Sequence, residues 1–168
     1  MVKELKLSNG KVVLLDDEDY EVLKFYKWHD KGNGYAMRIG KCTKETPNVR
    51  HMMHREIMKA KKGEYVDHIN GNKMDNRRKN LRVATNQQNA FNQGPRSTNT
   101  SGYKGVTWSE SRKKYVAQIT HNYKRICLGY FDCKHKAAIT YNNKAKELHG
   151  EFVKLNEIPK EYFELGGK

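Results

Sequence analysis

Cysteine, proline and long apolar runs are all scarce in this chain of 168 residues. The three cysteines, Cys42, Cys127 and Cys133, form no C-x-x-C pair, which argues against a disulfide framework and against a structural zinc site. No run of 18 or more apolar residues occurs, so no membrane span is expected. The first residues lack the apolar core of a signal peptide, and a cytoplasmic location is therefore expected.

Acidic residues are also few, because 33 Lys and Arg stand against 19 Asp and Glu, which gives a net charge of +14. The excess is uneven. Residues 51–150 carry 20 basic side chains against 7 acidic ones, whereas residues 1–50 are nearly balanced. A basic surface serves solubility, but it also attracts a polyanion by long-range electrostatic steering. We expect a polyanionic partner.

The stretch G-P-R-S-T-N-T-S-G, near the middle of the chain, has the composition of a linker, and no hydrophobic period continues through it. It divides the chain into two modules of different character. We expect a first domain over residues 1–93, a linker over 94–101, a second domain over 102–157 and a tail over 158–168.

The first domain is expected to begin as an α+β structure. The segment K-V-V-L-L predicts a strand, and the acidic run Asp16–Asp19 suits the N-terminal end of a helix. Val22, Phe25 and Tyr26 recur at helical spacing and would form its apolar face. The Gly-Asn-Gly sequence after Trp28 predicts a hairpin.

The segment from Tyr65 to Asn92 predicts a strand, a polar loop, a second strand and a helix. The first strand ends in Asp67-His68, and L-R-V-A-T reads as the second strand. Thr85 and Gln88 form a T-x-x-Q capping box that places the helix start near residue 86. Asparagines then lie on one helical face at a spacing of three residues. The order is that of a ββα unit.

With the V-D-H-I-N-G-N block, the D-N-R-x-x-N-L-R block and the helix asparagines, the chain resembles the HNH (ββα-metal) endonucleases, especially the homing-type enzymes of bacteriophages. The resemblance implies that His68 is the general base and that Asn80 holds the loop and orients it. It also implies that Asp67 and Asn89 ligate one divalent cation, Mg²⁺, for which Mn²⁺ would substitute. Asn92 is the alternative ligand if the helix register differs by three residues.

Two histidine questions remain open at this point. The third letter of the family name usually stands for a histidine, and here Asn89 takes that place, so the metal preference is open. His54 lies among apolar residues in M-H-R-E-I-M. A structural histidine packed beneath the site is favoured over a second catalytic one.

The second domain is predicted to be a three-stranded antiparallel sheet packed on one helix. Strands are expected at residues 103–108, 114–120 and 124–131, the last two joined as a hairpin. A helix follows between a plausible N-cap at Asp132 and a C-terminal Gly150. Such a helix would cover one sheet face and leave a polar, basic face open.

The Y-K-G-V, A-Q-I and L-G-Y-F segments, with the following A-A-x-x-x-Y-N helix, resemble the Apetala/ethylene-response-factor DNA-binding domain. That resemblance implies a sheet laid in the major groove of double-stranded DNA. Trp108 is equally well explained as a hydrophobic anchor. The residues expected to face DNA are Lys104, Trp108, Gln118, Thr120 and Arg125.

The expected fold class is therefore α+β, a ββα-metal nuclease domain followed by the sheet-and-helix domain. The expected function is site-selective hydrolysis of DNA phosphodiester bonds with one divalent metal and a histidine base, in a phage-type homing endonuclease. The alternative is a DNA-binding transcriptional regulator whose nuclease half is inactive. We expect a monomer without an obligate protein partner, in the host bacterial cytoplasm if a phage encodes it.

Overall fold

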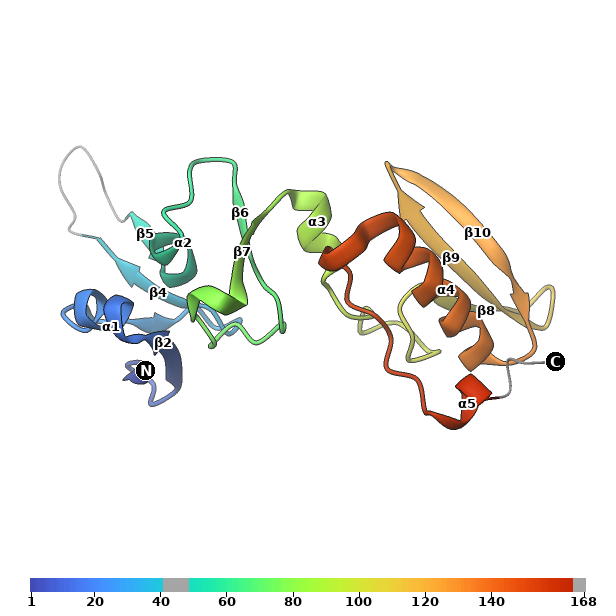
Figure 1. Cartoon of the computed structure of the whole chain (residues 1–168), viewed down its shortest axis with the longest axis horizontal. Helices are drawn as coiled ribbons and strands as arrows, with labels where there is room; N and C mark the ends of the chain where they lie inside the picture. The colour runs from blue at the N-terminus through green and yellow to red at the C-terminus, as the bar shows by residue number, and fades with distance from the viewer. Residues whose placement is uncertain (41–48, 165–168) are drawn as a thin grey trace. The chain divides into compact units, whose positions relative to one another are not determined.

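The computed structural model describes residues 1–40 and 49–164 and consists of two compact units, Met1–Ala90 and Phe91–Lys168 (Figure 1). Cys42 lies outside the described residues. The segment expected to be a linker, residues 94–101, falls inside the second unit. Its Asn99 and Ser101 side chains bond to the backbone of Tyr103 and Val106, so this segment is tied to the unit that follows it.

The described part of the first unit contains small antiparallel sheets with short helices between them. The N-terminal pair and the helix after it are β1 (Val2–Lys6), β2 (Val12–Asp16) and α1 (Asp17–Leu23). A second sheet and its following helix are β3 (His29–Asp30), β4 (Ala36–Ile39), β5 (Arg50–Met52) and α2 (Met53–Ile57). The expected strand K-V-V-L-L and the expected hairpin after Trp28 are both confirmed.

The core of this unit forms where these small sheets meet α1 and α2. Trp28 and Leu15 are fully buried in it, and the indole Nε1 donates to the carbonyl of Leu23 at 2.9 Å. The predicted apolar stripe of α1 is wrong, because Val22 and Phe25 are exposed. The buried side chains of α1 are Leu23 and Asp19.

The ββα segment follows α2. β6 (Tyr65–His68) pairs antiparallel with β7 (Leu81–Ala84), and α3 (Asn86–Phe91) follows β7 directly. The capping box is confirmed: Gln88 N–H donates to the Thr85 hydroxyl at 3.1 Å, and Thr85 N–H donates to Gln88 Oε1 at 2.8 Å. The helix accordingly begins at the residue after Thr85.

The second unit has a sheet of order β10-β9-β8. Its strands and its long helix are β8 (Val106–Ser109), β9 (Lys114–His121), β10 (Lys124–Phe131) and α4 (Lys134–His149). A 3₁₀ turn (Gly150–Phe152) and the short α5 (Glu161–Glu164) follow. The N-cap is Cys133 rather than Asp132, and Gly150 ends the helix at φ 55°, as expected.

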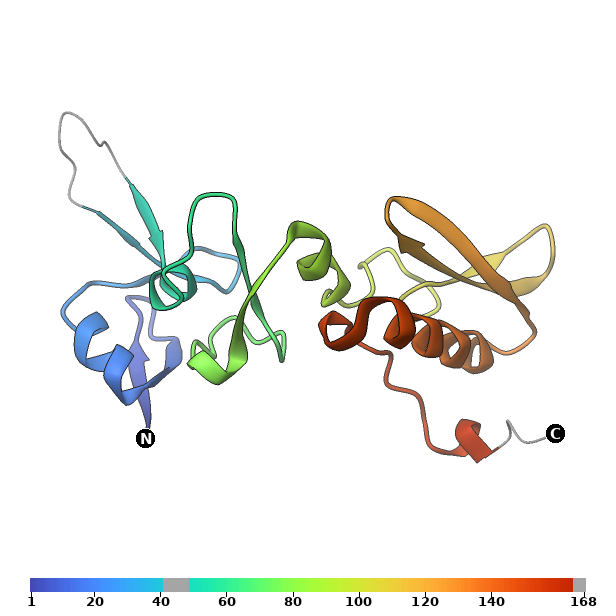
Figure 2. The ribbon, with the colours of Figure 1, turned by 45° about the horizontal axis from the view of Figure 1, so that its top comes forward.

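Helix α4 lies along one face of this sheet, as Figure 2 shows. Val106 and Ala117 of the sheet pack on Ala137 and Ala138 of the helix. Gly105, at φ +76°, lies so close to Tyr141 that an added Cβ would overlap its ring. The opposite face has no covering layer among the described residues of this unit. No helix in the described ranges is both long and apolar enough to cross a membrane.

Candidate active site

Strand β6 carries Asp67 and His68 into the interior of the first unit, where both are buried. The pairing places Asp67 opposite Arg82 and His68 opposite Leu81. Strand alternation alone would leave one of two successive side chains exposed. Both are buried here: His68 lies against the loop that follows β6, with its Nε2 3.3 Å from Asn76 Oδ1, and Asp67 lies against the side chain of Arg82 at 2.8 Å.

The ring of His68 lies in an aromatic cage. Its centroid is 5.2 Å from that of His54, in an edge-to-face arrangement, and 5.8 Å from that of Tyr35. His54, on α2, is itself buried and lies 5.1 Å from Tyr35. These rings restrict the plane of the His68 imidazole, and the packed position of His54 is the one expected for it from the sequence.

Burial keeps both imidazoles uncharged. It lowers the pKa of His68 below its ordinary value, although the hydrogen bond to Asn76 and the charges of Asp67 and Asp75 partly offset this effect. Burial also lowers the pKa of His54 to about 3, with smaller contributions from His68 and nearby cations. A neutral imidazole at pH 7 has a lone pair that can accept a proton, which a general base requires.

Asn80 lies under the loop between β6 and β7 and holds it from inside. Its Oδ1 accepts from Asn70 N–H at 3.0 Å, and its Nδ2 donates to Asp75 O at 2.7 Å. The side chain thus bridges two points of the loop backbone. This is a loop-holding position, and it acts on His68 only through the backbone that it supports.

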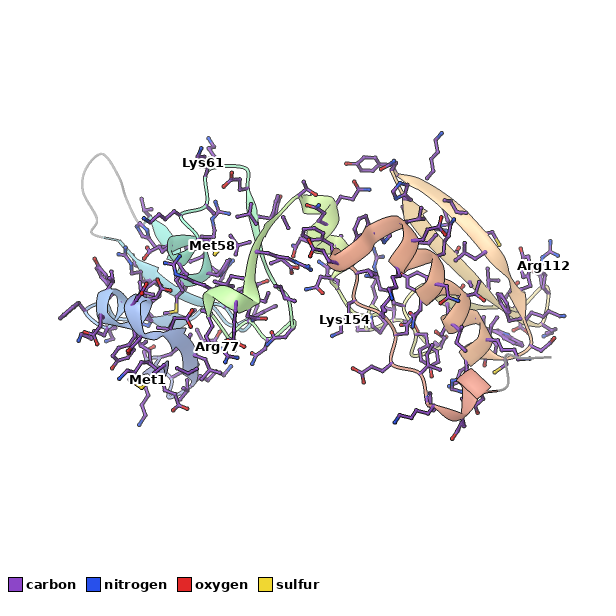
Figure 3. The ribbon with its side chains drawn as sticks, in the orientation of Figure 1. Met1, Met58, Lys61, Arg77, Arg112 and Lys154 are labelled. Carbon is purple, nitrogen blue, oxygen red and sulfur yellow. The ribbon has the colours of Figure 1, made fainter. Side chains whose placement is uncertain are left out.

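The same loop is attached to the N-terminal hairpin. Leu14 N–H donates to Met74 O and Asn76 N–H donates to Leu14 O, both at 2.9 Å. Arg77, labelled in Figure 3, pairs with the buried Asp75 at 2.6 Å. Through these contacts the D-N-R sequence holds the loop against the N-terminal hairpin.

A second attachment joins the end of this loop to α1. Arg78 pairs with Asp19 at 2.7 Å, and its backbone N–H donates to Asp16 Oδ2 at 2.7 Å. The acidic run of α1 therefore binds an arginine about sixty residues away in sequence, beyond any role at the helix N-terminus. Sequence reasoning missed these partners because no local pattern connects them.

Asp67 is ion-paired with its cross-strand neighbour. Arg82 Nε and an Arg82 terminal nitrogen donate to Asp67 Oδ2 at 3.0 and 2.8 Å. Asn89 lies on α3, a helix without a buried residue, and its backbone N–H donates to Thr85 O at 2.9 Å. The structure thus joins Asp67 to His68 through the strand and to Arg82 through an ion pair, and it does not join Asp67 to Asn89 by a hydrogen bond.

The donor chemistry of this pair fits a hard divalent cation, since a carboxylate and an amide oxygen are the ligands that Mg²⁺ and Mn²⁺ accept. Arg82 would compete with the cation for Asp67. Within residues 1–40 and 49–164, no three His, Cys, Asp or Glu side chains gather as a metal site. A site built on one carboxylate and one asparagine would not form such a group.

The residues expected to face DNA divide between the two faces of the second sheet. Gln118, Thr120 and Arg125 lie on the open face, where Thr120 is paired with Arg125 across β9 and β10. Trp108 lies on the other face, the one that α4 covers. Its ring centroid is 4.9 Å from that of Tyr115, which packs against the core beneath α4. Its Nε1 donates to Glu110 at 2.7 Å, and the side chain is 43% exposed.

Lys104 is not on the open face. Its Nζ donates to the carbonyls of Phe91 and Gln93 at 2.6 and 2.7 Å. Burial, together with the charge of Lys154, lowers the pKa of Lys104 to about 8. Lys104 therefore fastens the start of the second unit, and its expected place on the DNA-facing surface is corrected.

Two open-face residues were missed from the sequence. Tyr130 pairs across the sheet with Val116, on the side away from α4, and is 43% exposed. The guanidinium of Arg112, labelled in Figure 3 at the turn between β8 and β9, lies 4.4 Å from the centroid of this ring. The period-two alternation of β10 could have identified Tyr130, but the strand contains an irregularity between Cys127 and Gly129 that shifts the alternation.

Comparisons with known proteins point to one family. The model of the family described as HNH endonuclease matches residues 51–91, which include α2, β6, β7 and α3. An uncharacterized HNH endonuclease of Acanthamoeba polyphaga mimivirus is 32% identical over 156 residues, covering 90% of this chain and 78% of that protein. Protein 3.8 of Escherichia phage T7 is 36% identical over 94 residues, which is 56% of this chain and 77% of that protein. No solved structure matches. At 90% coverage, the first similarity extends through most of the second unit.

Proposed function

The chain belongs to the HNH endonuclease family, and from this premise we propose that it is a metal-dependent, site-selective DNA endonuclease of the homing type. The observation that carries the proposal is the neutral, caged imidazole of His68 beside the carboxylate of Asp67 at the end of β6. A buried histidine kept uncharged by its surroundings is suited to accept a proton near pH 7.

In the proposed reaction, His68 takes a proton from a water molecule whose oxygen attacks the scissile phosphorus. The bond from phosphorus to the 3′-oxygen breaks, and this oxygen takes up a proton from solvent, which leaves a 5′-phosphate and a 3′-hydroxyl end. Asn80 keeps the loop closed on the strand that bears His68. Asp67 and Asn89 would hold one Mg²⁺, and this ion would supply charge stabilisation for the phosphate and the leaving oxygen.

The second unit would place the nuclease on its substrate. Its open sheet face carries Gln118, Thr120 and Arg125, with Tyr130 and Arg112 at the far end. Hydrogen-bonding side chains on a sheet can read base edges in the major groove, and cations next to them bind phosphates. We assign this unit to the Apetala-type sheet readers, in line with the Y-K-G-V and L-G-Y-F resemblance.

The homing role is the finer part of the proposal. It is supported by the joining of a nuclease unit to a separate sheet unit, since a tethered reader raises affinity at selected sites. The two relatives named above are viral proteins, which suits a mobile or phage-borne enzyme. A monomer with a single site would nick one strand.

The function is tested by incubating the full chain with supercoiled plasmid in Mg²⁺, in Mn²⁺ and in EDTA. We expect nicking with either ion and none with the chelator. Asp67→Asn should lower the nicking rate by roughly a hundredfold or more, because it removes the charged ligand. The matched control is Asp19→Asn, which also alters a buried carboxylate paired with an arginine.

Asp19→Asn should stay within a few-fold of the wild-type rate. Equal loss in both variants would mean that the carboxylate of Asp67 has only a structural role. Tight binding of DNA by the wild-type protein without cleavage in either metal would contradict the enzyme and favour the DNA-binding regulator.

A further inference from the structure

Asn76 is a deeply buried polar residue beside His68, and no motif in the sequence assigns a role to it. It is 1% exposed and lies in the loop that follows β6. Its Oδ1 lies 3.3 Å from Nε2 of His68. Its backbone N–H is bonded to Leu14 O, so the residue is fixed to β2 as well as to its own loop.

The amide group of Asn76 can take only one orientation. Its Nδ2 donates to the carbonyl of Lys73 at 3.1 Å. A flipped amide would place two carbonyl oxygens against each other at that distance and would lose the bond. Its Oδ1 must therefore face His68, and a carbonyl oxygen can only accept a hydrogen bond.

We propose that Asn76 is a positioning residue that holds the proton of neutral His68 on Nε2, so that Nδ1 is the nitrogen with the lone pair that serves as the base. This inference rests on the proposed function for its catalytic consequence. The placement of the proton follows from the local geometry alone. The tautomer of a histidine is set by the partner of its other ring nitrogen, and here that partner is the Asn76 oxygen.

The arrangement also fixes how the ring is turned. The rings of Tyr35 and His54 restrict its plane, but both would accept the imidazole rotated by half a turn. The acceptor on Asn76 distinguishes Nε2 from Nδ1, because it lies against Nε2 at 3.3 Å. Asn76 thus adds to the two rings a hydrogen-bond acceptor that favours the orientation with Nε2 turned toward the loop.

The first test uses the unaltered protein labelled with ¹⁵N. Long-range ¹H–¹⁵N correlation spectra of the histidine rings distinguish a proton on Nε2 from one on Nδ1. We expect His68 to show a single Nε2–H tautomer, with a nuclear Overhauser effect from that proton to the Asn76 side-chain amide. A proton on Nδ1 would overturn the inference, whether or not the protein cuts DNA.

The second test measures nicking by Asn76→Leu under single-turnover conditions at saturating DNA. Misdirecting the base should lower the rate roughly tenfold to a hundredfold and leave DNA affinity unchanged. Asn72→Leu is the control, because this loop residue bonds to the Met74 backbone instead of to His68. Circular dichroism shows whether both variants are folded. If Asn76→Leu is unfolded, the ¹H–¹⁵N spectrum of the labelled wild-type protein remains the test of the proton's position.

The combination with His68→Ala separates positioning from a general effect on the loop. If Asn76 acts through His68, Asn76→Leu should cause no further loss once the imidazole is gone. A full additional loss in that background, or wild-type nicking by Asn76→Leu, would overturn the inference. Failure of the wild-type protein to nick at all would instead contradict the proposed function and leave the tautomer result standing.

Discussion

The buried His54 should make the first unit unstable in acid. Its pKa falls from 6.5 to about 3 on folding, mainly because burial disfavours the charged ring. Between these values the unfolded chain binds a proton that the folded chain does not bind. The free energy of unfolding therefore decreases as the pH falls through this window, and it is independent of this group above pH 7.

The magnitude follows from the width of the window. Each pH unit below 6.5 should remove about 1.4 kcal/mol, or about 3 kcal/mol between pH 6.5 and pH 4. That is a large part of the 5–15 kcal/mol or so typical of a small domain. His54→Leu, which is of similar volume and cannot ionise, should abolish this contribution and flatten the acid side of the stability curve.

The assay is urea unfolding followed by tryptophan fluorescence from pH 9 to pH 4. The chain has two tryptophans, Trp28 in the buried core of the first unit and Trp108 in the second, so a Trp108→Phe background reports the first unit alone. The curves of unfolding free energy against pH for the His54 protein and for His54→Leu should be parallel above pH 7 and diverge below pH 6.5. Parallel curves down to pH 4 would refute the assignment of His54 as a buried neutral group.

The remaining predictions concern the second unit. Gly105→Ala should lower the stability of this unit by about 2–4 kcal/mol, because the added Cβ would meet Tyr141 at 2.1 Å and φ is +76°. In the control Gly102→Ala, φ is +79° but the space is open, so the loss measured by thermal unfolding should be only about 1 kcal/mol. Equal losses in the two variants would contradict the clash with Tyr141. Arg125→Ala should weaken DNA binding and reduce the slope of the logarithm of the binding constant against log salt by about 1. Lys146→Ala, on the exposed side of α4, should change neither the affinity nor the slope. An unchanged slope in Arg125→Ala would exclude the open face as the DNA contact.

Local sequence patterns predicted the elements that depend on local chemistry. The Thr85–Gln88 capping box set the start of α3, and turn residues gave the β9–β10 hairpin, where Asn122 and Tyr123 both have positive φ. Alternation correctly placed Gln118 and Thr120 on the face opposite Ala117. These features need only neighbours in the chain, which a single sequence contains.

Features that depend on distant partners could not be predicted in the same way. Phe25 was assigned to the buried face of α1, yet Asp19 is buried instead, because Arg78 reaches it from 59 residues away. Asn76 lies in a loop with several asparagines, and no local pattern separates it from them. Its buried position depends on β2, where Leu14 O accepts from its backbone N–H. Strand alternation does not predict the position of the Lys104 side chain. Its Nζ binds the carbonyls of Phe91 and Gln93, which lie before the sheet in the chain.

The most direct test of the central claim is the single-turnover rate of DNA cleavage by His68→Ala, measured in Mg²⁺ with and without added imidazole. The account predicts a loss of roughly a hundredfold or more, with partial recovery when imidazole is supplied. Cleavage by His68→Ala at the wild-type rate would show that the caged imidazole takes no part in the reaction.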